Sequence, residues 1–468
     1  MTTSRLTPLI LAVALFMENM DSTVIATSLA AIAADIGTEP IALKLALTAY
    51  LVALAIFIPI SSWMADRFGA KSVFRGALLV FILGSVACAF SNSLPAFVGA
   101  RFLQGMGGAM MTPVARLVLV RATPRSELVA AMAWLTIPGL IGPIAGPPFG
   151  GFLTTYFSWH WIFLINVPIG LLGIWLVGRF LPETVRHAPR RIDMRGFFLA
   201  GTAFAGTVFG ISVISLPALP PVVGVITVGL GLVAAVVYVL HARRTEHPLL
   251  DLRLLRFPFF RTAVVAGTFF RLGLGATPFL FPLMLQLSFG LTPFQSGLVT
   301  FAGAIGALAA KFVAHALFVR FGFRAALAAA TLVTTLGVLA MGFYDAATPV
   351  PLMVAILVIS GFAQSMFWTG SSAFTFADID DKDAGQANVI SQVWGQITFA
   401  LGVALGGGVL EVSHMLRGGD IAVWDFHLAF YVVAAVCAVS PVLFWRLPRN
   451  AGQQLITDGR DEETREAA

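Results

Sequence analysis

Two acidic side chains lie in the first long apolar run of the chain, which covers residues 8–30. Glu18 and Asp21 are about one turn apart on a helix. If the run crosses a membrane, its carboxyl groups are costly to keep there and are expected to bind protons, ions or substrate. The other interpretation is that either acid only pairs with a neighbouring helix. Asp21 is the candidate for reversible protonation, and Glu18 is a candidate contact for a cationic substrate.

A basic residue in the fourth apolar run is a possible partner for Asp21. Arg101 and Gln104 are three residues apart and share one helical face. At a rise of 1.5 Å per residue, Asp21 and Arg101 are expected roughly 13 Å and 8 Å below the same membrane surface, where they could meet directly or through water. A neighbouring guanidinium favours a charged carboxylate, whereas loss of water disfavours it. Movement of Arg101 or entry of substrate would then switch Asp21 between holding and releasing a proton. Gln104 is also a candidate substrate contact.

The second half of the chain offers a further set of polar residues inside apolar runs. Arg271 is near the middle of its run, where it either binds a substrate anion or pairs with an acid. Gln364 and Trp368 share a face of the run 350–372, and Asn388 and Gln392 form a polar stripe along the run 385–410. Such stripes commonly hold helices together, but next to a central cavity they would contact substrate.

A short charged turn separates the second and third apolar runs. Asp66 can cap a helix start and pair with a basic residue across the bundle, while Gly69 permits the turn. The other members of the turn are the basic residues Arg67, Lys71 and Arg75. A phosphate-binding loop is excluded because Met64 stands where the first glycine is required. Either the turn latches a gate or its charges only orient the helices.

A weaker copy of the turn occurs in the second half of the chain. Residues 319–324 again contain Arg-Phe-Gly with a basic residue two positions later, but Val319 replaces the acid. Two copies in corresponding places indicate a duplicated protein with parallel repeats, an arrangement typical of transporters whose halves rock about a central site.

The fifth apolar run is rich in glycine and proline. Gly142, Gly146 and Gly150 are spaced by four, so they fall on one face and allow close approach of another helix. Pro147 and its neighbouring prolines free backbone groups and permit bending, and Gly151 ends the pattern. A static seam would need only the glycines, so the prolines favour an interface that flexes.

The composition places these residues in a membrane. Of the 468 residues 58% are hydrophobic and only 11% are charged, and the mean hydropathy is +0.90. Runs of about twenty residues indicate helices rather than a barrel. Fourteen spans are predicted, at 8–30, 41–63, 73–92, 96–116, 127–154, 160–181, 196–216, 220–240, 262–287, 294–318, 325–343, 350–372, 385–410 and 427–446.

The positive charges predict the orientation of these spans. With the N-terminus inside, 24 of the 29 Lys and Arg residues fall in inner loops, tails or span ends, two lie outside (Lys44 and Arg417), and three lie within spans (Arg101, Arg271 and Lys311). The net charge of +6 is therefore a topology signal that points to anionic lipids as partners and not to nucleic acid. Both termini are expected in the cytoplasm.

The loops divide the chain into parts. We predict an N-terminal six-helix bundle over 1–182, basic linkers with two additional membrane helices over 183–261, a C-terminal six-helix bundle over 262–447 and a disordered cytoplasmic tail over 448–468. The two additional helices carry no charge and are expected to face lipid.

The chain resembles the major facilitator superfamily, and within it the fourteen-span drug:proton antiporters. The resemblance rests on the turn after the second span, the fourth-span segment around Arg101, the fifth-span glycines and the sequence after Asp21. Ser62 departs from the turn motif, where the family usually has glycine. The resemblance implies two six-helix bundles with alternating access, proton coupling at Asp21, a gating role for the turn, and a fifth-span motif that separates exchangers from importers.

The predicted function is therefore proton-coupled export of drugs or other amphiphilic small molecules across a bacterial cytoplasmic membrane. An importer or facilitator of the same fold is the alternative. A membrane enzyme or channel is disfavoured because no nucleophile constellation or selectivity filter is visible. No metal or cofactor is expected besides protons, and a monomer is expected. Nothing in the sequence supports accessory efflux proteins as partners.

Overall fold

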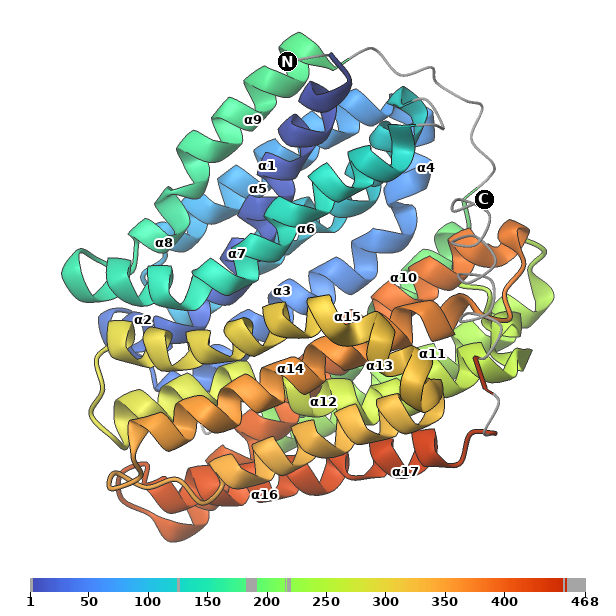
Figure 1. Ribbon diagram of the computed structural model, residues 1–468. Coiled ribbons are helices and arrows are strands. Elements are labelled where there is room, and N and C mark those ends of the chain that lie inside the picture. Colours follow the sequence, from blue (N-terminus) through green and yellow to red (C-terminus); the bar gives the residue numbers. More distant parts are fainter. Residues whose placement is uncertain are drawn as a thin grey trace. The chain divides into compact units, whose positions relative to one another are not determined.

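The computed structural model describes residues 3–123, 127–181, 192–214, 216, 220–448 and 451–452, and within them every regular element is a helix (Figure 1). The helices are α1 (Thr3–Val24), α2 (Leu29–Asp35), α3 (Lys44–Phe57), α4 (Ser61–Phe68), α5 (Ala70–Ala89), α6 (Leu94–Ala122), α7 (Leu128–Tyr156), α8 (Trp161–Leu164), α9 (Asn166–Phe180), α10 (Met194–Ile214), α11 (Pro221–Arg244), α12 (Pro258–Leu287), α13 (Pro293–Met341), α14 (Val350–Phe376), α15 (Asp381–Arg417), α16 (Val423–Cys437) and α17 (Val439–Trp445). The predicted all-helical fold is confirmed.

Thirteen of the described helical segments are long and apolar enough to cross a membrane. The longest, α13, has 49 residues, more than twice the ~20 residues that a bilayer requires. It is interrupted at Gly322, whose φ of 76° and ψ of 161° lie outside the helical region. The break falls between the predicted spans 294–318 and 325–343. Counted as two spans, α13 accounts for the predicted fourteen.

Gly322 and Gly69 occupy corresponding places in the two halves. Gly69 separates α4 from α5 with a φ of 88°, and both values lie in the region that favours glycine. The sequence repeat is therefore also a repeat of backbone conformation.

The chain divides into two compact units. The first comprises residues 1–249 together with 282–298, and the second comprises 250–281 together with 299–468. The helices α10 and α11 thus group with the first six spans.

Helices α10 and α11 form a closely packed hairpin. A Cβ atom on Gly206 would lie 2.8 Å from the Gly231 Cα atom, and one on Gly210 would lie 2.7 Å from the Val228 nitrogen. The hairpin contacts α3, where the rings of Phe57 and Phe197 are 5.9 Å apart. Its outer face exposes large apolar side chains, including those of Val225, Ile226, Leu230, Val233 and Val236. This surface suits contact with lipid.

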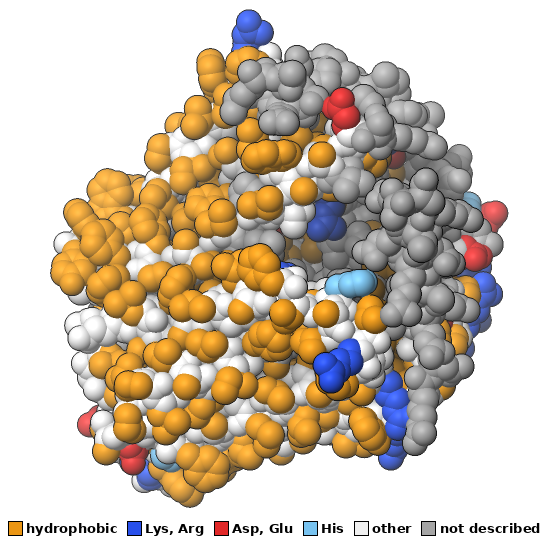
Figure 2. Space-filling view, in the orientation of Figure 1, with side chains coloured by type: hydrophobic (Ala, Val, Ile, Leu, Met, Phe, Trp, Pro, Cys, Tyr) orange, Lys and Arg blue, Asp and Glu red, His pale blue; other side chains and the backbone are white. Residues whose placement is uncertain are grey.

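The described surface is mainly apolar, as expected of a membrane protein. On the face in Figure 2, hydrophobic side chains are spread over the whole part that is not grey, and charged side chains are few. Contact of such a surface with water is unfavourable, whereas contact with the hydrocarbon of a bilayer is not.

The second unit repeats the glycine seams of the first. Helices α12 and α15 meet where a Cβ atom on Gly275 would contact the Phe399 carbonyl oxygen and one on Gly402 would contact the Leu272 carbonyl oxygen. Asp378, which follows α14, accepts hydrogen bonds from the backbone N–H groups of Phe259 (2.7 Å) and Phe260 (3.2 Å). These bonds cap the first turn of α12, where backbone N–H groups have no partner within the helix.

Candidate functional site

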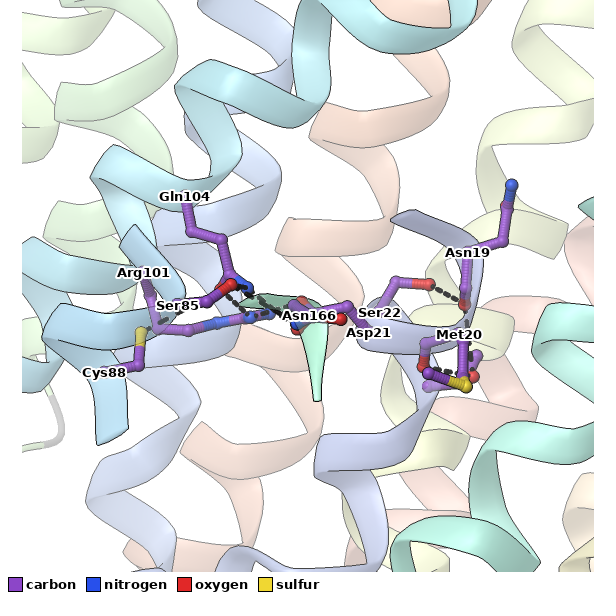
Figure 3. A network of polar contacts seen from close by, with 10 residues as sticks. Asn19, Met20, Asp21, Ser22, Ser85, Cys88, Arg101, Gln104 and Asn166 are labelled. Atoms are coloured by element: carbon purple, nitrogen blue, oxygen red, sulfur yellow. Dashed lines mark hydrogen bonds and ion pairs between the residues drawn. The ribbon is translucent and has the colours of Figure 1, made fainter. Parts of the chain in front are cut away.

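The candidate site of the first unit is an ion pair buried between α1 and α6. The Arg101 Nη1 atom lies 2.8 Å from the Asp21 Oδ2 atom, and the two side chains are 1% and 0% exposed (Figure 3). The contact expected from their depth along the helices is present. An exposed ion pair contributes little to stability, but a buried pair cannot lose one member without leaving an uncompensated charge.

Three further groups complete the surroundings of Asp21. Its Oδ1 atom accepts hydrogen bonds from the side-chain amides of Gln104 (2.8 Å) and Asn166 (2.7 Å). The Ser85 hydroxyl accepts from the same two amides, at 2.8 and 3.3 Å. Asp21 therefore faces three donors, which suits an ionised carboxylate because that group only accepts. The donors come from α6 and α9, so side chains of these two helices meet at an acid of α1.

Arg101 is held by more than its acid. Its Nη1 atom also donates to the Gln104 Oε1 atom, and its guanidinium lies 4.3 Å from the centre of the Tyr50 ring and 5.9 Å from that of Phe163. Aromatic faces attract a cation and, being bulky, exclude water. Arg101 Nε and the Tyr50 hydroxyl are buried without a hydrogen-bond partner. The network thus has unused donors next to its acid.

Three members of this network, Tyr50, Ser85 and Asn166, were not identified from the sequence. Each is an uncharged polar residue in a long apolar run, and such residues usually reflect helix packing. The best available signal was Asn166, because a buried amide in a span requires partners. Gln104, expected to contact substrate, lies inside the network and is fully buried.

Glu18 lies one turn from Asp21 but has a different partner. Its Oε2 atom accepts a hydrogen bond of 2.9 Å from the Thr112 hydroxyl of α6, and the side chain is only partly buried. The two acids of α1 are therefore in different surroundings: Asp21 is fully buried and Glu18 is partly exposed.

The fifth-span glycines bring α7 against α1 at the level of Asp21. A Cβ atom on Gly142 would lie 2.9 Å from the Met20 nitrogen, one on Gly146 would meet the Thr23 hydroxyl, and one on Gly150 would meet the Val24 carbonyl oxygen. These three glycines thus share the predicted face. They contact residues on either side of Asp21, so a movement of α7 would displace α1, the helix that carries the acid.

The end of the same motif has different neighbours. A Cβ atom on Gly151 would lie 2.8 Å from the Phe294 Cα atom, at the start of α13. The Pro147 carbonyl oxygen accepts a hydrogen bond of 3.3 Å from the Thr27 hydroxyl.

The charged turn is tied to two helices of its unit. Asp66 Oδ1 and Arg121 Nη2 of α6 are 2.7 Å apart, and both side chains are about one-third exposed. Lys71 donates a hydrogen bond of 2.8 Å to the Leu181 carbonyl oxygen, just after α9. Arg75 runs along α9, because a Cβ atom on Gly178 would lie 3.5 Å from its guanidinium carbon. The Arg67 guanidinium lies over a ring of its own helix, α4, at 5.8 Å from the Trp63 ring centre.

One expectation about Asp66 is wrong. Asp66 does not cap a helix start, because α4 continues through it to Phe68 and the N-cap position of α5 is occupied by Gly69. Helix α5 has no side-chain cap bond at this end. The expected pairing of Asp66 with a basic residue across the bundle is present.

The candidate residues of the second unit lie on α12, α14 and α15. Arg271 is 5% exposed, and its guanidinium carbon is 5.5 Å from the Trp368 ring centre. Gln364, one turn before Trp368, is partly buried. Asn388 accepts a hydrogen bond of 3.1 Å from Gln392, so part of the polar stripe of α15 is bonded within its own helix.

The family model that describes the Major Facilitator Superfamily matches residues 11–243 and 263–466. The chain belongs to this superfamily. Curated relatives named "Putative multidrug resistance protein MdtD" match over almost their whole length. The protein from Pectobacterium atrosepticum is 33% identical over 95% of this chain and 96% of the relative, and that from Salmonella typhimurium is 32% identical over 96% of each.

Solved structures of the superfamily share the fold. The D-xylose-proton symporter has a TM-score of 0.69 with 13% identity, covering 95% of this chain and 98% of that one. An inward-facing bacterial homolog of the human lysosomal transporter Spinster has a TM-score of 0.64 with 14% identity, covering 95% and 96%. With its many apolar helices, the chain is a multi-pass membrane protein with the fold of a superfamily transporter.

Proposed function

We propose that the protein is a proton-coupled antiporter that exports drugs or other amphiphilic small molecules. The observation that supports this most is the acid Asp21, fully buried in a transporter fold and bonded by Arg101, Gln104 and Asn166. An ionisable group kept inside a membrane span is costly and is usually functional. The names of the relatives support a drug-like substrate class.

The network also provides a place for the proton. A protonated Asp21 has an O–H donor, and the groups around it also donate. One of these groups must therefore turn an acceptor toward Asp21. The Asn166 Oδ1 atom is buried without a hydrogen-bond partner. Rotation of that amide by half a turn would present this oxygen to a protonated Asp21. Protonation would also remove the charge that holds Arg101, loosening α1 from α6.

The remaining roles follow from the same scheme. The partly buried Glu18 and Thr112 lie next to the coupling acid and are proposed to contact substrate, and the α1–α7 seam is proposed to flex as the acid changes state. The protein is proposed to act as a monomer in a bacterial cytoplasmic membrane with both termini in the cytoplasm. Protons are the only coupling ion, and lipids are its surroundings.

Proton release from inside-out membrane vesicles tests the proposal. With the lumen acidified, addition of a transported dye should discharge the proton gradient, which a fluorescent pH probe reports, while vesicles without the protein should show no response. Dye uptake with no proton release would favour a facilitator, and protons moving in the same direction as the dye would show symport. Either result would contradict antiport.

The charged turn is proposed to latch the inner gate through Asp66, Arg67, Gly69, Lys71 and Arg75. Asp66→Ala should slow dye export about two- to fivefold, since an ion pair that is about one-third exposed contributes at most about 1 kcal/mol. The free energy of unfolding should change by no more than about that amount. Arg121→Ala should behave alike, and exchanging the two charges should restore transport. Undiminished turnover of Asp66→Ala would leave the turn as a topology anchor only.

A further inference from the structure

Arg271 is a buried cation that no described acid neutralises. Its side chain is 5% exposed, and its Nε and Nη1 atoms are buried without a hydrogen-bond partner. Arg101 in the first unit shows the contrast, because it pairs with Asp21 at 2.8 Å. None of the ion pairs among the described residues includes Arg271. The sequence left two roles open for this residue, and pairing with an acid is not the one observed.

The acids of the second unit that have assigned bonds are engaged elsewhere. Asp378 caps α12, and Asp425 is bonded by Arg417 and Ser413. An aromatic ring lies beside Arg271 instead. Trp368 lies beside its guanidinium and stacks on Phe399 with ring centres 6.0 Å apart, and Phe270 packs on Phe367 at 3.9 Å. Ring faces attract a cation but accept no strong hydrogen bonds, so the N–H groups stay unsatisfied.

An unpaired charge in a membrane helix is costly and is usually functional. A guanidinium binds a carboxylate through two parallel N–H groups, and free Nε and Nη1 atoms leave a donor available on each edge of the fork. The guanidinium packs closely on its own helix, because a Cβ atom on Gly267 would lie 3.3 Å from Nη1. The flat Trp368 ring next to the guanidinium suits an aromatic group on the same ligand.

We propose that Arg271 and Trp368 form an anion-binding subsite for aromatic carboxylates, so that the exported molecules include organic anions. Arg271 binds the carboxylate, Trp368 stacks on the aromatic ring, and Gln364 lies one helical turn from Trp368 on the same face. This inference rests on the proposed export function and narrows its substrate class.

Two xanthene dyes of opposite charge test the subsite. Fluorescein carries a carboxylate, whereas rhodamine 123 is cationic on the same ring system. The purified protein should bind fluorescein, measured by fluorescence polarisation, and Arg271→Gln should weaken that binding at least about tenfold. Binding of rhodamine 123 should not weaken. Arg256→Gln, which removes an exposed arginine of the same unit, is the charge-matched control and should bind fluorescein normally.

Thermal unfolding of the ligand-free protein separates this role from a structural one. Because Arg271 has no acid to lose and its Nε and Nη1 atoms make no hydrogen bond, Arg271→Gln should unfold at the wild-type temperature or higher, whereas a structural guanidinium would give a lower value. Arg271→Lys keeps the charge without the fork and should bind fluorescein with intermediate affinity.

Three results would overturn the subsite: no fluorescein binding by the wild type, equal binding by wild type and Arg271→Gln, or a large loss of stability in that variant. Proton release driven by rhodamine 123 would meanwhile still report antiport. Failure of the subsite and failure of the export function are therefore distinguishable.

Discussion

Replacing Asp21 with Asn should abolish dye-driven proton release while the protein remains folded in the membrane. The amide cannot ionise, so no proton can be exchanged at this position. It keeps one oxygen for Arg101, but its NH₂ group would face the amides of Gln104 or Asn166, which also donate. Vesicles with an acidified lumen and a fluorescent pH probe measure the effect. Dye binding by purified protein should persist and shows that the variant is folded.

The charge left on Arg101 requires a second variant. Asp21→Asn alone leaves a buried guanidinium without its counter-charge and should lower stability by about 3 kcal/mol. Asp21→Asn combined with Arg101→Gln removes both charges and should recover much of that stability without recovering proton release. Loss of coupling in both variants then cannot be ascribed to misfolding. Wild-type proton release in Asp21→Asn would remove Asp21 from the coupling mechanism.

Gly150→Ala should lower dye export at least about tenfold, the second largest effect expected. The added methyl group would overlap the Val24 carbonyl oxygen and lie 2.6 Å from the Val24 Cγ2 atom, so α7 must move away from α1. Val24 is one turn from Asp21, and the displacement would disturb the bonds of the acid. Transport in vesicles measures the rate, and thermal unfolding measures the cost of separating the helices.

Gly76 provides the matched control for the seam. A Cβ atom there would meet no atom within 4 Å, although Gly76 also lies inside a helix. Gly76→Ala should leave transport unchanged and add about 0.5–1 kcal/mol of stability, because alanine loses less backbone freedom on folding. If Gly150→Ala transported as fast as Gly76→Ala, close approach of α1 and α7 would not matter for the cycle.

Much of the fold could be predicted because its determinants are local. Apolar runs of about twenty residues give the spans, and Gly69 and Gly322 mark breaks because few other residues adopt positive φ. The family and the helical fold are confirmed on this basis. The interpretation of Asp66 as a helix cap failed because local sequence does not determine how far a helix continues, and α4 runs through the acid to Phe68.

The sequence predicted the charged members of the candidate site, and Gln104 only as a residue on the same helical face as Arg101. Asp21 and Arg101 stand out because ionisable residues are rare in spans, and their depth could be estimated from the helical rise. Ser85 and Asn166 became recognisable only when α5 and α9 were placed around α1. Their role depends on helix rotation about the bundle, and hydropathy contains no information on which uncharged polar residues face one another. The glycines of the fifth span could be predicted to form a close helix contact, but the sequence did not identify α1 as the helix they contact.

The α10–α11 hairpin bears on how such a chain can lengthen. Its two helices pack on each other through Gly206, Gly210 and Gly231, so each helix buries its glycine face against the other. A pair of this kind can enter a bilayer together, without rearranging the helices made before it. Two crossings also return the chain to the side from which it started. An insertion of even parity therefore leaves the orientation of every later helix unchanged, including the one that carries Arg271.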